Sequence, residues 1–90
     1  MTPALRAANP PTIASWIEER IDALHADAAP SYEEHALRSR RVGLLRRILE
    51  DPALGKVRAG IRTRISLGIE DVLIESWALP LVAEAMEARP

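Results

Sequence analysis

Apolar residues recur at every third or fourth position in four segments of this 90-residue chain. This spacing places them along one face of an α-helix, because the helix turns once in about 3.6 residues. We therefore predict an all-α fold, a small antiparallel four-helix bundle. The helices are expected at about 13–28, 32–49, 52–67 and 70–88.

Capping residues support the starts of the first three helices. Thr12 can cap the first helix, and Ser31 with Glu34 has the S-x-x-E spacing of a capping box. Asp51 followed by Pro52 combines a good N-cap with a proline suited to the first helical position. These signals agree with the helices that the apolar spacing predicts.

The last predicted helix is apolar around most of its circumference and carries Pro80 near its middle. Proline in a helix interior predicts a kink or a break at that point. A helix with so wide an apolar surface is central in a bundle or buried against a partner subunit. A homodimer is favoured, and a central helix in a monomer is the alternative. The interface candidates are Leu73, Trp77, Leu81 and Val82.

The chain has the length of one domain, expected at 12–90, with residues 1–11 as a flexible N-terminal tail. The absence of cysteine excludes disulfides and zinc sites with sulfur ligands. No apolar run approaches the length of a membrane span or a signal peptide, so we expect a cytoplasmic protein. Eleven Arg, one Lys and fifteen Ala indicate a GC-rich bacterial or phage genome.

Charge is divided along the chain, although the net charge is only −1. Residues 1–37 carry two Arg and six acidic residues, and residues 65–90 carry one Arg and five acidic residues. Residues 38–64 carry nine basic and two acidic residues. The basic middle segment either binds an anionic partner or is neutralised by the two acidic ends.

Four charged side chains fall on otherwise apolar helix faces when the helices are drawn at about 100° per residue. They are Arg38, Arg41, Arg58 and Glu75. A charge in such a position must be paired, extend its end group into water, or face a partner. Two interpretations stay open. The arginines pair internally with Glu75, or Arg41 and Arg58 converge on an anionic ligand or an acidic partner surface.

Further basic residues lie outside these apolar faces, on the second and third predicted helices. The candidates for binding are Arg47, Arg62 and Arg64, with Arg40, Arg46 and Lys56 nearby on the helices. If the two helices pack antiparallel, some of these side chains share a surface that could hold phosphates. The alternative is a solvated face paired with acidic residues, namely Glu18, Glu19, Glu33, Glu34 and Glu84.

Motifs for catalysis or metal binding are absent from the sequence. It contains no G-x-S-x-G motif, no P-loop and no G-x-G-x-x-G motif. His25 lies one turn after Asp22, and His35 follows Glu34, but no Glu-x-x-His motif of a carboxylate-bridged metal bundle occurs. We expect both histidines on solvated helix edges, and we expect no metal and no cofactor.

The sequence therefore favours a non-enzymatic helical binding protein that acts through another protein, as inhibitors, antitoxins, anti-defence proteins and adaptors do. One alternative is a nucleic-acid-binding transcriptional regulator that uses the basic helices at 32–67. The other is a small enzyme or ligand-binding bundle with Arg41, Arg58 and Glu75 around an anionic molecule.

Overall fold

The computed structural model describes residues 12–28 and 31–88, which form four α-helices and contain no strand. The helices are α2 (Ile13–Ala26), α3 (Tyr32–Glu50), α4 (Gly55–Ser66) and α5 (Asp71–Glu87), with a short 3₁₀ helix, η1 (Pro52–Leu54), before α4. The predicted all-α, four-helix fold is confirmed, and the predicted bounds agree closely with these elements. The predicted tail at 1–11 lies outside the described residues.

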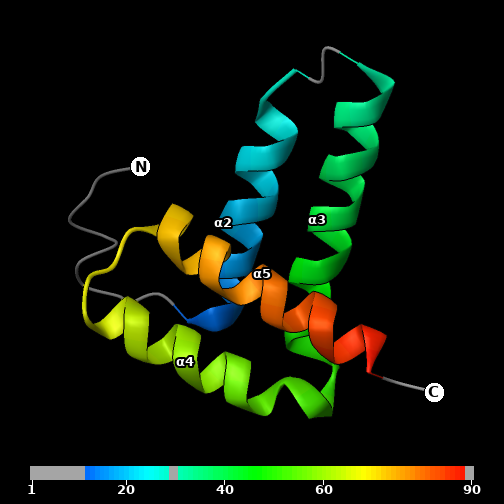
Figure 1. The fold of residues 1–90 in the computed structure, drawn as a ribbon. Coiled ribbons are helices and arrows are strands. Elements are labelled where there is room, and N and C mark those ends of the chain that lie inside the picture. Colours follow the sequence, from blue (N-terminus) through cyan, green and yellow to red (C-terminus); the bar gives the residue numbers. More distant parts are fainter. Residues whose placement is uncertain (1–11, 29–30, 89–90) are drawn as a thin grey trace.

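The four helices form two antiparallel hairpins that cross each other (Figure 1). Helices α2 and α3 run in opposite directions beside each other, and α4 and α5 do the same. Helix α5 also packs on α3, whereas α4 lies at the edge of the molecule. The predicted antiparallel packing therefore holds within each hairpin, but the two hairpins do not share one axis. The turn at η1 redirects the chain from α3 into α4 and so produces this crossing.

Side-chain caps begin the two helices of the first hairpin. At α2 the hydroxyl of Thr12 accepts a hydrogen bond from Ser15 N at 3.1 Å, and the Ser15 hydroxyl accepts one from Thr12 N at 2.9 Å. This reciprocal capping box satisfies two backbone donors that the helix leaves free. At α3 the Ser31 hydroxyl accepts from Glu34 N at 3.1 Å, so the predicted S-x-x-E start forms through its serine.

The junction between α3 and α4 begins with Asp51, as predicted. Its carboxylate accepts a hydrogen bond from Ala53 N at 3.0 Å. The following residues, Pro52–Leu54, adopt a tighter 3₁₀ turn, so α4 itself starts at Gly55 and not at the proline. Gly68 ends the helical segment with a φ of +73°, the left-handed conformation that glycine adopts readily.

The core lies where the two hairpins cross and draws on every helix. Its largest fully buried side chains are Trp16, Ile17, Leu45, Ile48, Leu54, Ile61, Ile74 and Val82. Trp16 of α2 also donates a hydrogen bond from its indole Nε1 to Asp71 Oδ1 of α5 at 3.0 Å. This bond pairs the polar atom of the largest core side chain and ties the start of α5 to α2.

Helix α5 continues through Pro80, so of the two predicted alternatives, a kink or a break, the break does not occur. Proline leaves the carbonyl of Ser76, four residues earlier, without its helical donor. Both Pro80 and Ser76 are exposed, so water can hydrate that carbonyl. Ala78 and Val82 are fully buried and hold the helix to the core on both sides of the proline. Val82, predicted as an interface residue, is therefore a core residue.

Close packing between α4 and α5 depends on Gly60. A Cβ atom at this position would overlap the indole ring of Trp77. The guanidinium of Arg64 covers the same ring, with its Cζ 3.6 Å from the ring centroid, a cation–π contact. Trp77 is thus held between the backbone of α4 at Gly60 and the side chain of Arg64.

Replacing Gly60 by alanine tests this close approach. We expect Gly60→Ala to lower the free energy of unfolding by about 1–3 kcal/mol, because the added methyl group overpacks against Trp77. The matched control is Gly43→Ala in α3, where a Cβ meets nothing within 4 Å. That change is expected to stabilise the protein by up to about 1 kcal/mol through helix propensity. Urea denaturation measures both, and equal stabilisation by the two changes would contradict the packing described here.

Candidate functional site

Glu75 is buried in α5, and two arginines of the other hairpin hold its carboxylate. Its side chain is only 3% exposed. Arg20 of α2 donates from Nε to Oε2 at 2.8 Å, and Arg41 of α3 donates from Nη2 to Oε1. The structure thus shows internal pairing for Arg41 and Glu75. Together with Arg20, these contacts join α2, α3 and α5 at one point.

Arg20 was not a candidate in the sequence, although a signal for it exists. It lies four residues after Trp16 and four before Leu24, and both of these side chains are buried. Residues four apart share one helix face, so Arg20 is a charge on the buried face of α2. Spacing alone identifies Arg20 as a charge on this face, but it does not identify Glu75 as its partner.

Arg41 carries its charge in a crowded cationic environment. Its pKa is lowered from the ordinary value, first by burial and then by the positive charges of Arg20 and Arg38. A guanidinium nevertheless stays protonated in proteins. Glu75 therefore balances two positive charges, and its removal would leave both of them facing each other.

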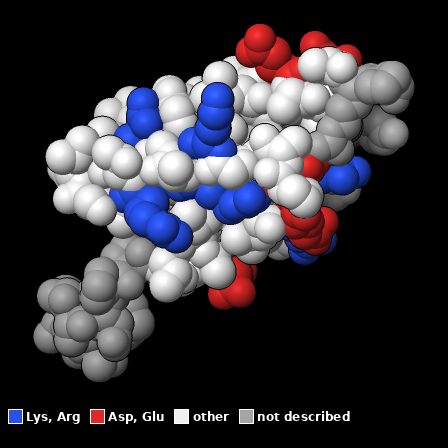
Figure 2. Space-filling model, turned by 90° about the horizontal axis from the view of Figure 1, so that it is seen from below, with Lys and Arg blue, Asp and Glu red and all other residues white. Residues whose placement is uncertain are grey.

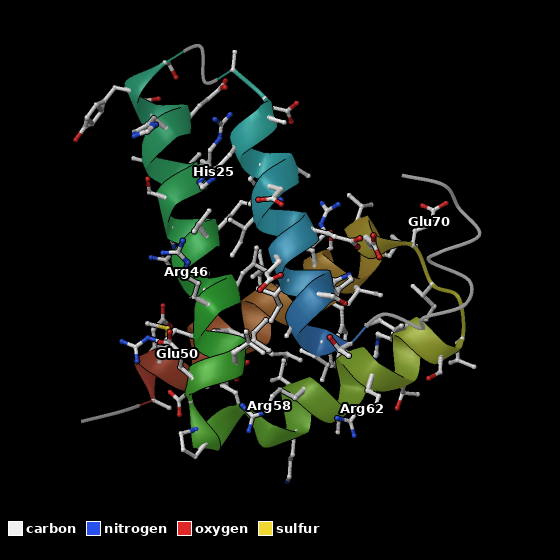
Figure 3. All side chains as sticks on the ribbon, turned by 180° about the vertical axis from the view of Figure 1, so that it is seen from behind. His25, Arg46, Glu50, Arg58, Arg62 and Glu70 are labelled. Atoms are coloured by element: carbon white, nitrogen blue, oxygen red, sulfur yellow. The ribbon has the colours of Figure 1, made fainter. Side chains whose placement is uncertain are left out.

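Arg58 does not join this cluster. Its Nη1 donates to the backbone carbonyls of Ile48 at 2.7 Å and Asp51 at 2.8 Å. These carbonyls lie at the C-terminal end of α3, where a helix leaves acceptors unpaired and a cation is favourable. Figure 3 shows Arg58 at this end of α3. Arg41, Arg58 and Glu75 therefore do not surround one anionic molecule.

Basic side chains gather on the outward face of α4, as Figure 2 shows. The stretch 52–69 contains no acidic residue. Exposed Lys56 and Arg62 alternate there with short side chains, namely Ala59, Thr63 and Ser66. Within residues 12–28 and 31–88, no ion pair joins Lys56 or Arg62 to an acidic side chain. Neither of these two residues therefore forms the predicted pairing with an acidic side chain within the described chain.

The other predicted basic residues differ in their surroundings. Arg64 lies on Trp77 and donates to the carbonyl of Gly60 at 3.2 Å, so it serves the packing of α4 on α5. Arg47 is exposed near the end of α3, and Arg38 is half-buried nearer the tip of the first hairpin. The structure does not bring these three arginines together with Arg62 into one cluster.

An apolar groove of about 450 Å³ lies between the α4 segment and α5. Its apolar walls contain buried Leu54 and Val57 on one side and half-buried Trp77 with 37% exposed Leu81 on the other. Two charged residues, Lys56 and Glu84, line the groove from opposite helices, and the lining also includes Ala53, Ala85 and Ala88. We call this feature the α4–α5 groove. It contains two of the predicted interface residues, Trp77 and Leu81.

Leu73, the remaining interface candidate, is 56% exposed and does not line the α4–α5 groove. Together with exposed Val72 it forms apolar surface near the start of α5. Nothing in a single chain tests self-association, so the predicted homodimer stays a prediction.

The described part of the chain was searched for metal-binding groups and for membrane-spanning helices. Residues 12–28 and 31–88 contain no group of three or more His, Asp or Glu placed to hold a metal ion. None of their helices is long and apolar enough to cross a membrane.

Comparisons with models of protein families, with curated proteins and with solved structures found no match.

Glu75 provides the direct test of the buried cluster. We expect Glu75→Gln to lower the free energy of unfolding by about 3 kcal/mol, because a neutral amide leaves two guanidinium groups without a counter-charge. Urea denaturation at neutral pH measures this loss. The matched control is Glu84→Gln on the exposed side of the same helix, with an expected change within about 0.5 kcal/mol. Similar small losses in both variants would show that the Glu75 pairs contribute little.

Proposed function

We propose that this protein is a non-enzymatic binding protein that docks on a partner protein through the α4–α5 groove. The observation that carries the proposal is an open apolar groove beside a helix whose exposed basic residues have no partner in the described chain. An inhibitor, an antitoxin or an adaptor acts through a surface of this kind.

The apolar part of the groove would provide the anchor. Trp77 is fixed by Gly60 and Arg64, so it presents a rigid ring and loses little freedom when a partner covers it. Leu81 lies in the same wall and is partly exposed without a ligand. A few such aromatic and aliphatic side chains in a pocket carry most of the binding energy in protein interfaces.

Charge indicates which partner would fit. Lys56 lines the groove from α4, and Arg62 follows on the exposed face of the same helix. A partner segment needs apolar side chains for the groove and acidic side chains toward α4. We therefore favour an amphipathic helix with an acidic face, which supplies both at helical spacing. The opposite charges would speed association and select the partner.

Site-specific photo-cross-linking tests this proposal. A photoreactive amino acid replaces Leu81 in the groove, and a matched variant carries it at Leu73, an exposed leucine of the same helix outside the groove. In the source cells we expect position 81, and not position 73, to cross-link to a distinct protein through an apolar and acidic segment. Adding Lys56→Glu should reduce the yield about tenfold, since it places like charges together.

Two results would contradict the proposal. The first is the absence of any cross-linked protein at position 81 while the labelled chain is folded. The second is cross-linking of position 81 only to other copies of this chain, which would assign the groove to the homodimer instead.

A second candidate function is binding of duplex DNA through the outward face of α4. It is favoured by the acid-free stretch 52–69 and by the short side chains between Lys56 and Arg62, which allow close approach to a phosphate backbone. Helix α4 also lies at the edge of the molecule, where a DNA groove could reach it (Figure 1). The groove beside Trp77 plays no part in this alternative.

Salt dependence tests DNA binding. We expect the affinity for duplex DNA to fall steeply with salt, and Arg62→Ala to reduce the slope of log K against log salt by about 1. Arg40→Ala, a change of an exposed arginine on α3, is the control and should leave the slope unchanged. Fluorescence anisotropy measures both. Binding that does not depend on salt, or equal effects of the two changes, would exclude α4 as the DNA-binding face.

A further inference from the structure

A second hollow, separate from the α4–α5 groove, lies between α2 and α3. Its volume is about 540 Å³, within the range of small-molecule pockets. We call it the hairpin hollow, and it is lined by His25, His35, Arg38, Ser39, Val42, Gly43 and Arg46. His25 belongs to the last turn of α2, and Arg46 lies on the facing helix α3 (Figure 3).

Nitrogen donors dominate the lining of the hairpin hollow. Four of its seven residues are histidine or arginine, and none is acidic. No hydrogen bond or ion pair within residues 12–28 and 31–88 occupies these four side chains. Another hollow along the hairpin contains acidic residues, including Asp22, and shares Arg46 with this one. The cationic character is therefore a local property of the hairpin hollow.

Gly43 gives the second line of evidence. Glycine in the middle of a helix such as α3 is unfavourable compared with alanine. At Gly60 the packing of Trp77 explains the glycine, but a Cβ at Gly43 would meet nothing within 4 Å. Packing therefore gives no reason for glycine at position 43. Because Gly43 lines the hairpin hollow, its missing side chain leaves the hollow open.

We propose that the hairpin hollow binds the phosphate group of a small molecule. Arginine forks and imidazole N–H groups are donors that match the oxygens of a phosphate dianion. A metal cation is excluded by Arg38 and Arg46, which would repel it from the two imidazoles. A carboxylate ligand carries only one negative charge, so a phosphate dianion compensates more of the positive charge in the lining. This site is independent of the function proposed for the α4–α5 groove.

Titration of the ¹⁵N-labelled full chain with inorganic phosphate tests the site, with sodium chloride keeping the ionic strength constant. We expect saturable NMR shifts at Gly43, Ser39 and the histidine rings. Shifts that do not saturate would overturn the proposal.

Three variants locate the binding. Arg46→Gln removes a donor, and Gly43→Gln fills the hollow while retaining every charge. Each should raise the Kd for phosphate about fivefold, the loss expected for one charge-assisted hydrogen bond at an exposed site. Arg40→Gln removes an exposed charge of the same helix that does not line the hollow, and it should change the Kd less than about twofold. Circular dichroism shows that each variant is folded.

The results decide between a site and a diffuse charge effect. Equal weakening by Arg40→Gln and Arg46→Gln, or unchanged affinity in folded Gly43→Gln, would overturn the proposal. A short DNA duplex that shifts the same signals at lower phosphate concentration than inorganic phosphate would also overturn it, because the ligand would then be a nucleic acid.

Discussion

The carboxylate of Glu75 joins the two crossed hairpins. A buried carboxylate is tolerated only where its counter-charges reach it, so Arg20 of α2 and Arg41 of α3 must both stand opposite α5. We infer that Glu75 specifies the crossing of the hairpins more than it adds to the free energy of folding. The apolar core around it supplies most of that free energy.

The basic residues divide into two groups with different tasks. One group has internal partners: Arg20 and Arg41 hold Glu75, Arg58 caps α3, and Arg64 covers Trp77. The other group lies on α3 and α4 without an ion pair in the described chain, and it consists of Arg38, Arg40, Arg46, Arg47, Lys56 and Arg62. The surfaces proposed for binding use the second group. A change in the first group would therefore affect stability before it affects recognition.

Local features of the sequence predicted the helices well. The 3.6-residue spacing and the caps at Thr12, Ser31 and Asp51 identify four helical segments, and each is present. For Glu75 the charge on an apolar face left an internal pair and a ligand site open, and the structure has the internal pair. At Pro80 the sequence left a kink and a break open, because the continuity of the helix depends on buried contacts on both sides of the proline.

Features that depend on how two helices pack could not be predicted from local sequence spacing. The crossing of the hairpins follows from the direction that the chain takes through η1. The partner of Glu75 on α2 needed a comparison of faces between helices that lie far apart in the sequence. The α4–α5 groove and the hairpin hollow each combine residues of two helices. At Gly43 the informative observation is that a Cβ atom would meet nothing within 4 Å. The sequence carries no sign of this empty space.

Native-state hydrogen exchange tests most directly whether Glu75 makes the two hairpins one cooperative unit. The decisive amides lie at residues 16–20 of α2, 45–48 of α3 and 74–78 of α5, around the buried cluster. If the account is correct, all three groups exchange through one opening whose free energy equals that of global unfolding. Exchange of the α5 amides at a distinctly lower free energy, while α2 and α3 stay protected, would contradict it.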